Sequence, residues 1–489
     1  MKVSLLYINE KLPLNADDLI IDLGLNQVIE TMAGNDKFIF DTCTKVLLTG
    51  VNDETEIAYR HDVLVDAINN PSIVEQMYQI LNDASTKARN RLYFITKPHP
   101  IYLLYESISV LEIFIEVLGK IKTVVGDNSV YFKSEGFRSF FKIIFDEFNL
   151  QYITMVMNHI NNLRFNNGIT FRCEIGSGNK LVNYILLKPD SKKRLAFLRK
   201  REEYSYNLPA MDEGGAQILD DMRNAAVADT AEIIKMAADN ALGFINDTKA
   251  QIAFYVGCIN LHKKMKDLGE PTAIPRISKS SVKFKGLYDI SLSLAIKGGT
   301  VKNSLEIEKP LVIVTGPNSG GKSTLLRSLG QAQLMLRAGM FVPAEYYEGP
   351  LLKTINTHFR RGESAKMEAG NFENELVHIK AAIENTAVHG LVLLNEPFSS
   401  TNAIEATELS RQIIDSLIEG GVHVVVVTHF YELAWEYIKD PNAVFLKAER
   451  KEDGTRTFRI VPGEPSFTSY GEEIFLKVFG DLKVHKAAD

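Results

Sequence analysis

The residues that most directly suggest chemistry lie in a glycine-rich loop between an apolar run and an amphipathic segment. Residues 311–325 read LVIVTGPNSGGKSTL, and Gly316, Gly321, Lys322 and Ser323 satisfy the pattern GxxxxGK[ST]. This pattern binds phosphate when a strand precedes it and a helix follows it. Because glycine has no Cβ, consecutive N–H groups can surround an anion, which the positive end of the next helix also attracts. We predict a nucleotide phosphate site; the alternative is a Gly/Ser turn beside an unrelated lysine.

The side chains of the loop have separate expected roles. Lys322 would reach the terminal phosphates, and the Ser323 hydroxyl would coordinate Mg2+. ATP and Mg2+ are therefore the expected cofactors. The residues expected to contact the nucleotide are Gly316, Pro317, Asn318, Ser319, Gly320, Gly321, Lys322, Ser323 and Thr324.

A second apolar run, LVLLNEPFSST at 391–401, contains Asn395 and Glu396. A strand end beside a phosphate loop is where a nucleotidase places the groups that orient Mg2+ and activate water. Glu396 is the candidate general base for water that attacks the γ-phosphate. Asn395 stands where an Asp would accept from a Mg2+-bound water, and its uncharged amide oxygen predicts weaker Mg2+ binding and slower turnover. The alternative is an ordinary strand end with a surface acid.

A third apolar run, HVVVVTHF at 423–430, ends in Thr428 and His429. An imidazole at the same edge of the sheet can hydrogen-bond the γ-phosphate and sense its presence. Alone, a histidine after a valine run is more often a capped strand end. Its place in chain order, after the loop and the strand ending in Asn395, makes His429 the second candidate catalytic residue.

The elements that must position these groups alternate between strands and helices from about residue 277 onward. This order is typical of a parallel sheet with crossover helices. Continuous apolar runs also fit strands that are buried on both faces. The predicted strands are Leu311–Thr315, Leu391–Glu396, Val422–Thr428 and Ala443–Leu446.

The first 125 residues are predicted to be mostly helical. Apolar residues recur at helical spacing over 57–70, 72–81 and 102–118, and a proline stops the first of these segments.

Residues 151–267 predict a hairpin followed by a long helix. The runs 169–174 and 181–187 flank a Gly-Ser-Gly-Asn turn, as in a hairpin. An apolar stripe over 220–267 predicts one helix of about 70 Å, in which Gly243 and Gly257 favour a kink or a break.

The densest basic run of the chain follows the predicted hairpin. Such runs are usually solvated surface, and contact with a phosphate backbone is the functional alternative. The candidate DNA contacts are Lys192, Lys193, Arg194, Arg199 and Lys200.

Bulk composition excludes several classes of protein. The 489 residues allow two to four domains, and 45% hydrophobic with 24% charged residues describes a soluble globular protein. A net charge of -6 gives no global reason to expect nucleic acid. Glutamates interrupt the most apolar span, 101–121, so no membrane span or membrane partner is expected. The polar N-terminus predicts no signal peptide, and 3 widely spaced cysteines predict a reducing cytoplasm without a zinc site.

At several motifs the chain resembles the MutS family of DNA mismatch-repair ATPases. TGPNSGGKST is similar to the family's TGPNMGGKST loop, and Leu394-Asn395-Glu396 to its LDE, with Asn in place of Asp. The other similar segments are 338–344 to GxxVPA, 361–364 with 367–375 to GRSTFxxEM, 399–401 to the GRGTS turn, 428–433 to THYFEL, 469–471 to SYG, and 57–64 to IxxRQ.

The resemblance implies an α/β P-loop NTPase domain of the ABC type, MutS-like, preceded by a mainly α-helical lever and clamp domain. The implied parts are a helical core at 1–125, long lever helices at 126–270 with a short clamp-like insert near 151–203, and the ATPase domain with C-terminal helices at 271–489. The family's N-terminal mismatch-reading domain is expected to be absent. In the family two ATPase domains dimerise with composite sites, so Ser364 would face the γ-phosphate of the partner's ATP.

Two functions from different classes remain open. The first is a cytoplasmic, homodimeric MutS-like ATPase that gates a clamp on mismatched, branched or recombining duplex DNA, in repair or recombination control. The second is a nucleotide-dependent protein-interaction switch or scaffold with no direct DNA binding. A transporter ATPase subunit is disfavoured because the chain lacks LSGGQ and a helical half precedes the ATPase.

Overall fold

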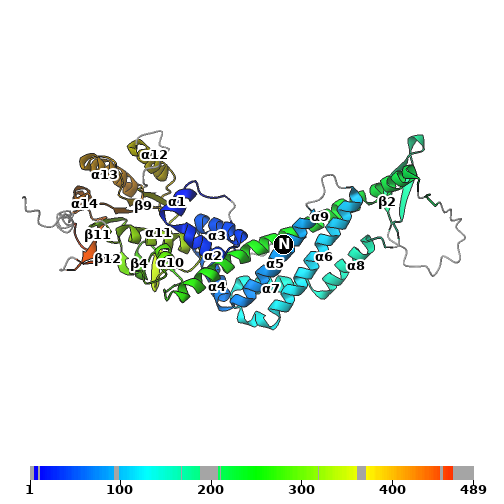
Figure 1. Ribbon diagram of the computed structural model, residues 1–489, viewed down its shortest axis with the longest axis horizontal. Helices are drawn as coiled ribbons and strands as arrows, with labels where there is room; N and C mark the ends of the chain where they lie inside the picture. The colour runs from blue at the N-terminus through cyan, green and yellow to red at the C-terminus, as the bar shows by residue number, and fades with distance from the viewer. Residues whose placement is uncertain are drawn as a thin grey trace, which may run out of the picture. The chain divides into compact units, whose positions relative to one another are not determined.

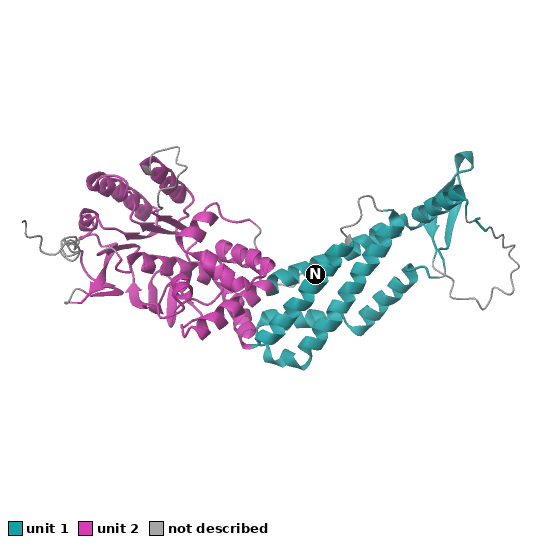
Figure 2. Ribbon diagram, in the orientation of Figure 1, with its two compact units in different colours: residues 1–5, 70–252 teal, residues 6–69, 253–489 magenta. Residues whose placement is uncertain are grey.

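The computed structural model describes residues 5–8, 11–92, 99–166, 168–187, 207–209, 211–317, 319–360, 371–451 and 455–465. Contacts divide the chain into two compact units, which Figure 2 colours separately. The first unit comprises residues 1–5 and 70–252, and the second comprises residues 6–69 and 253–489. Each unit is described by itself below.

The first unit is mainly helical (Figure 1). Its elements are α5 (Pro71–Leu92), α6 (Pro100–Val125), the 3-10 helix η1 (Gly126–Tyr131), α7 (Glu135–Lys142), the π-helix η2 (Ile143–Glu147), α8 (Leu150–Leu163), β1 (Phe171–Ile175), η3 (Ser177–Asn179), β2 (Leu181–Leu186) and most of α9 (Glu213–Asp267). Leu104, Ile108, Ile160 and Val227 share one buried cluster, so α6, α8 and α9 pack together.

The sequence predictions for this unit are confirmed in part. β1 and β2 pair antiparallel as the expected hairpin. The helix expected to end near residue 81 continues to Leu92 because Ala84 and Ala88 extend its buried stripe. α9 begins at Glu213 and runs as one helix through Gly243 and Gly257, so neither glycine breaks it.

The second unit combines helices with two sheets (Figure 1). The helices are α1 (Ala16–Asp22), α2 (Leu25–Ala33), α3 (Lys37–Thr49), α4 (Glu54–Asn69), α10 (Ile290–Ile296), α11 (Lys322–Ala338), α12 (Asn371–Glu384), α13 (Ala403–Glu419) and α14 (Tyr431–Glu436). The strands are β3 (Arg276–Ser278), β4 (Val282–Leu287), β5 (Asn303–Ile307), β6 (Leu311–Thr315), β7 (Tyr346–Pro350), β8 (Ile355–Phe359), β9 (Leu391–Asn395), β10 (His423–Val427), β11 (Ala443–Arg450) and β12 (Arg456–Pro462).

The larger sheet has the strand order β12-β11-β6-β10-β9-β8, and the smaller has the order β3-β7-β4-β5. In the larger sheet β6 pairs parallel with both β10 and β11, β10 pairs parallel with β9, and β9 pairs parallel with β8. All five residues of β6 are buried. The four strands predicted from sequence are therefore confirmed as neighbours in one sheet, whereas β8, β12 and the smaller sheet were not predicted.

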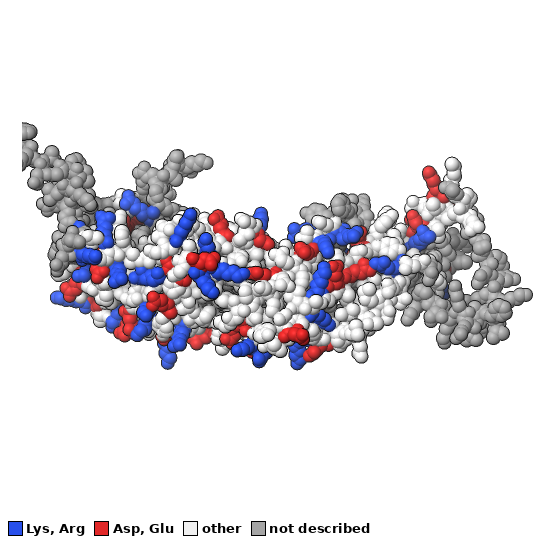
Figure 3. Space-filling model, turned by 60° about the horizontal axis from the view of Figure 1, so that its bottom comes forward, with Lys and Arg blue, Asp and Glu red and all other residues white. Residues whose placement is uncertain are grey.

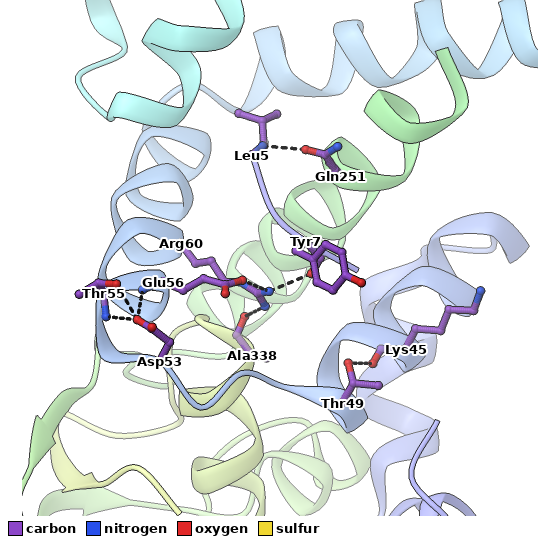
Figure 4. Close-up of polar contacts among 10 residues, drawn as sticks. All are labelled: Leu5, Tyr7, Lys45, Thr49, Asp53, Thr55, Glu56, Arg60, Gln251 and Ala338. Atoms are coloured by element: carbon purple, nitrogen blue, oxygen red, sulfur yellow. Dashed lines mark hydrogen bonds and ion pairs between the residues drawn. The ribbon is translucent and has the colours of Figure 1, made fainter. Parts of the chain in front are cut away.

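An arginine fixes the C-terminal end of α11 within the second unit (Figure 4). Arg60 of α4 is 1% exposed. Its guanidinium donates to Glu56 Oε1 at 2.6 Å, to the carbonyl of Tyr7 at 2.8 Å and to the carbonyl of Ala338 at 3.3 Å. Gly339 follows with φ 73, and a Cβ there would lie 2.5 Å from Arg60 Cβ. The cation thus lies at the negative end of α11, where it is electrostatically favourable.

The two central glycines of α9 differ in their surroundings, which predicts opposite effects of one substitution. At Gly243 an added Cβ meets no atom within 4 Å, whereas at Gly257 it would lie 2.5 Å from the Sγ of fully buried Cys43. We expect Gly243→Ala to raise the free energy of unfolding by about 0.5–1 kcal/mol through helix propensity. We expect Gly257→Ala to lower it by about 1–3 kcal/mol through overpacking.

Urea unfolding of both variants measures these effects. Cys43→Ala in the Gly257→Ala background is the internal control, because removal of the sulfur leaves room for the new methyl group. If Gly257→Ala is equally destabilising with and without Cys43, the close helix contact is not its cause.

His61 of α4 predicts a pH dependence of stability. Burial lowers the pKa of this imidazole from 6.5 to about 4, and a hydrogen bond with the backbone of Met340 only partly opposes the shift. Because the unfolded chain binds the proton more readily, this contribution is complete above pH 6.5 and is lost as the pH falls to about 4. The loss amounts to about 3 kcal/mol in the free energy of unfolding.

The measurement is the difference in unfolding free energy between pH 7 and pH 4.5. His61→Gln should reduce this difference, and His378→Gln, at an exposed histidine of α12, should leave it unchanged. An equally steep pH dependence in His61→Gln would contradict the prediction.

Candidate functional site

The predicted phosphate loop joins β6 to α11 at the carboxyl edge of the larger sheet. Gly316 has φ 123, Ser319 has φ 59 and Gly321 has φ 95. Gly321 is also the N-cap of α11, and no side chain caps the helix there. The N-cap itself therefore supplies no side-chain acceptor to the first turn of α11, whose N–H groups a bound anion can satisfy. Pro317 and Thr324 are half-buried beside these residues.

Close packing against β11 and β12 gives a second reason for glycine in this loop. A Cβ at Gly316 or Gly320 would lie 3.0 or 2.8 Å from Ala448 Cβ, and one at Gly321 would lie 2.7 Å from the carbonyl oxygen of Phe458. The three glycines therefore let the loop lie directly on the neighbouring strands. Any larger residue at these positions would displace the loop from the sheet.

Lys322 lies in the loop and is 4% exposed. Its Nζ donates to the carbonyl oxygens of Gly316 at 2.8 Å and Pro317 at 3.0 Å. Burial lowers the pKa of the ammonium group below its ordinary value, and the nearby Glu396 carboxylate acts in the opposite direction. The loop thus holds a desolvated cation beside uncapped helix N–H groups, an arrangement suited to a multiply charged anion.

Ser323 and Asn395 meet across the sheet. The Ser323 hydroxyl donates to Asn395 Oδ1 at 2.9 Å. Ser323 lies in α11, which follows β6, and Asn395 is the last residue of β9; β10 lies between these two strands in the sheet. Hydroxyl and amide oxygens are acceptable ligands for Mg2+, which usually takes its remaining ligands from phosphate and water. Among the described residues no cluster of three or more His, Cys, Asp or Glu could hold a metal. The pair thus fits a Mg2+ ion that is bound together with nucleotide phosphates.

Glu396 and His429 complete the same edge. Glu396 has φ 55, its N–H donates to the carbonyl of Val427 at 2.8 Å, and its side chain is 20% exposed. His429 Nδ1 lies 3.9 Å from Glu396 Oε1, and its ring packs on Phe430. Lys322, Ser323, Asn395, Glu396 and His429 therefore lie at the ends of three adjacent parallel strands.

Glu375 of α12 ends the segment that the sequence analysis compared with GRSTFxxEM without giving this residue a role, and it also reaches this edge. Its carboxylate accepts from the N–H of Phe398 at 2.6 Å and from the Ser400 hydroxyl, and it lies 3.4 Å from His358 Nε2. These partners come from β8 and from the turn that follows Glu396. No spacing in the sequence signals such a contact, because the partners are 17, 23 and 25 residues away.

Other predicted site residues fall outside the described part of the chain. These are Asn318 of the loop, Ser364, and the candidate DNA contacts Lys192, Lys193, Arg194, Arg199 and Lys200. On the face drawn in Figure 3, acidic and basic side chains of the described residues are interspersed. No helix of the described chain is both long and apolar enough to cross a bilayer.

Comparison with known proteins assigns most of the chain to one family. Residues 52–268 match the MutS2 N-terminal domain, and residues 312–486 match MutS domain V. The chain is 30% identical over 175 residues to the DNA mismatch repair protein MutS of Thermus thermophilus, which covers 36% of this chain and 22% of that protein.

Two proteins named endonuclease MutS2 are also similar. The one from Lactiplantibacillus plantarum is 30% identical over 166 residues, covering 33% of this chain and 21% of that protein. The one from Thermus thermophilus is 33% identical over 135 residues, covering 27% and 18%. These alignments span about a fifth of the length of the curated relatives.

The two domain matches leave only residues 1–51, 269–311 and 487–489 unassigned. The first match covers mainly helices, and the second covers most of the sheet that carries the candidate site. The relatives that align with the chain carry the same family name. The chain is therefore a member of the MutS family.

Proposed function

We propose that the chain is a Mg2+-dependent ATPase with a P-loop NTPase domain, which couples ATP binding and hydrolysis to clamping on DNA. The carrying observation is that Lys322, the Ser323–Asn395 pair, Glu396 and His429 lie together at one edge of a parallel sheet. The match to MutS domain V supports the same reading. We further propose that the chain works in the cytoplasm as a homodimer with composite sites, to which Ser364 contributes.

Each group has a proposed task in hydrolysis. Bound Mg·ATP supplies the electrophilic γ-phosphorus and the phosphoanhydride bond that breaks. Lys322 compensates charge on the terminal phosphates, and Ser323 with Asn395 holds the metal. Glu396 accepts the proton of the attacking water. His429 donates to a γ-phosphate oxygen, so that its contact exists only while that phosphate is present.

DNA is the proposed partner of the helical part, as mismatched, branched or recombining duplex. The match of residues 52–268 to the MutS2 N-terminal domain and the words "DNA mismatch repair" in one relative's name support this proposal. The competing proposal is a protein-interaction switch that never holds DNA. Its support is the uncharged Asn395, which predicts weak Mg2+ binding and slow turnover.

The test is ATP hydrolysis with and without a four-way junction, a mismatched duplex and a perfect duplex. We expect DNA to change the turnover rate, and Lys322→Ala and Glu396→Ala each to reduce it by at least about a hundredfold, since each removes a group that stabilises or forms the transition state. Lys283→Ala and Glu306→Ala are matched controls, because they delete the same groups from an exposed ion pair on β4 and β5.

The pattern of results separates the two proposals. Turnover that ranks the DNA structures supports the DNA clamp. Turnover that is indifferent to every DNA, or tight ATP binding without turnover, supports the protein switch. Hydrolysis that survives both Lys322→Ala and Glu396→Ala would remove the assigned site altogether.

Asn395→Asp tests the metal assignment. A carboxylate at this position still accepts the Ser323 hydrogen bond, and its charge should strengthen the interaction with Mg2+ by about 1 kcal/mol. We expect the Mg2+ concentration for half-maximal turnover to fall several-fold. Asn402→Asp is the control, since this residue is the exposed N-cap of α13. An unchanged Mg2+ dependence in Asn395→Asp would mean that residue 395 does not face the metal.

A further inference from the structure

The turn that follows β9 is strained. Glu396 and Phe398 have φ values of 55 and 58, in the left-handed region that residues other than glycine rarely adopt. Each such residue costs on the order of 1–3 kcal/mol and persists only where its surroundings hold it. The carboxylate of Glu396 thus has its direction set by a backbone conformation that the turn alone does not favour.

Two residues of α12 hold this turn. Phe372 packs against the fully buried ring of Phe398, with ring centroids 6.2 Å apart. Glu375 accepts from the Phe398 N–H at 2.6 Å through Oε1 and from the Ser400 hydroxyl through Oε2. The carboxylate therefore uses both oxygens on the turn from 396 to 400.

A third side chain, that of His358, also contacts the Glu375 carboxylate. His358 Nε2, on β8, lies 3.4 Å from Oε1, and the side chains of His358 and Glu375 are 9% and 10% exposed. Burial alone would raise the pKa of Glu375. The hydrogen bonds from His358, Ser400 and the Phe398 N–H outweigh that effect and leave the pKa below its ordinary value. At neutral pH the group is an ionised acceptor, and bonds to an ionised acceptor are stronger than bonds to a neutral one.

We propose that Glu375 is a positioning residue for hydrolysis: it holds the 396–400 turn so that the Glu396 carboxylate faces the phosphate loop. The inference rests on the proposed ATPase function and goes beyond it, because Glu375 contacts neither the loop nor the candidate metal pair. It acts through the backbone of Phe398, two residues after the candidate base. His358 contacts the same Oε1 atom of Glu375 that accepts from the Phe398 N–H.

Glu375→Gln is the discriminating change. It keeps the shape of the side chain but removes its charge and leaves one acceptor oxygen, so the Phe398 N–H and the Ser400 hydroxyl can no longer both donate to an ionised carboxylate. We expect kcat to fall on the order of tenfold to a hundredfold, since small displacements of a reacting group have effects of this size. The Kd for a fluorescent ATP analogue should stay within about twofold, because the loop and Lys322 are unchanged.

Three further variants sharpen the test. Glu375→Asp keeps the charge and should recover part of the lost kcat. Ser400→Ala removes one of the two bonds and should give a smaller loss than Glu375→Gln. Glu384→Gln makes the same substitution at the end of α12, where Glu384 forms an exposed ion pair with Lys380, and should leave kcat unchanged.

Hydrogen exchange of the peptide that spans 396–402 provides a readout that needs no turnover. Glu375→Gln should speed exchange at the Phe398 amide by about tenfold, since its acceptor changes from an ionised carboxylate to a neutral amide oxygen. If kcat and the exchange rate both match wild type, the positioning role is wrong. If kcat and ATP affinity fall together with the melting temperature, Glu375 has a structural role only.

The outcomes also separate this inference from the proposed function. Wild-type hydrolysis that requires Glu396 but tolerates Glu375→Gln overturns the inference alone. Absence of hydrolysis by the wild-type chain overturns the ATPase proposal and the positioning role of Glu375 together. Faster exchange at Phe398 with a selective loss of kcat supports both.

Discussion

Burial of three adjacent parallel strands is the constraint on which the rest of the structure depends. β6 is buried along its whole length, and β10 and β9 are buried except at single end residues. Such strands have no room for polar side chains between their ends. Polar groups therefore appear where the strands leave the sheet, and parallel pairing brings those ends to one edge. Strand direction and burial therefore decide where the polar groups gather, and the individual side chains decide only which chemistry is available there.

The charge balance of this edge is unusual for a metal-dependent site. Lys322 is the buried cation and Glu396 the nearby carboxylate, while Asn395 contributes an acceptor without charge. A second carboxylate would attract Mg2+ but would also repel a triphosphate. Under the proposed function, the site with Asn395 would depend more on the nucleotide's own phosphates to retain the metal. This balance would favour binding of Mg·ATP as a unit over prior loading of Mg2+.

The sequence predicted local features better than contacts between distant segments. The loop, the β1–β2 hairpin and the strands around His429 and Asn395 were predicted because each has a local pattern of apolar runs and turn residues. The role of Glu375 could not be predicted, since its partners belong to other elements. Gly257 was interpreted as a weak point of α9, although it is the place where the buried Cys43 approaches the helix. Helix propensity describes the chain alone, whereas this packing is tertiary.

Helix α11 connects the site to the N-terminal helices of the second unit. Its first residue, Lys322, belongs to the phosphate loop, and its body is bonded to segments about three hundred positions earlier in the chain. Gln331 Nε2 donates to the carbonyl of Leu23 at 2.8 Å, and Arg337 Nη2 donates to that of Thr49 at 3.2 Å.

The backbone makes the same connection, because the N–H of Val51 donates to the carbonyl of Arg337 at 2.8 Å. These bonds tie the middle and the C-terminal end of α11 to residues 23–51. The helix whose first turn borders the phosphate loop is therefore anchored to the N-terminal helices of the same unit, and under the proposed function a phosphate that displaced the loop would act against these bonds.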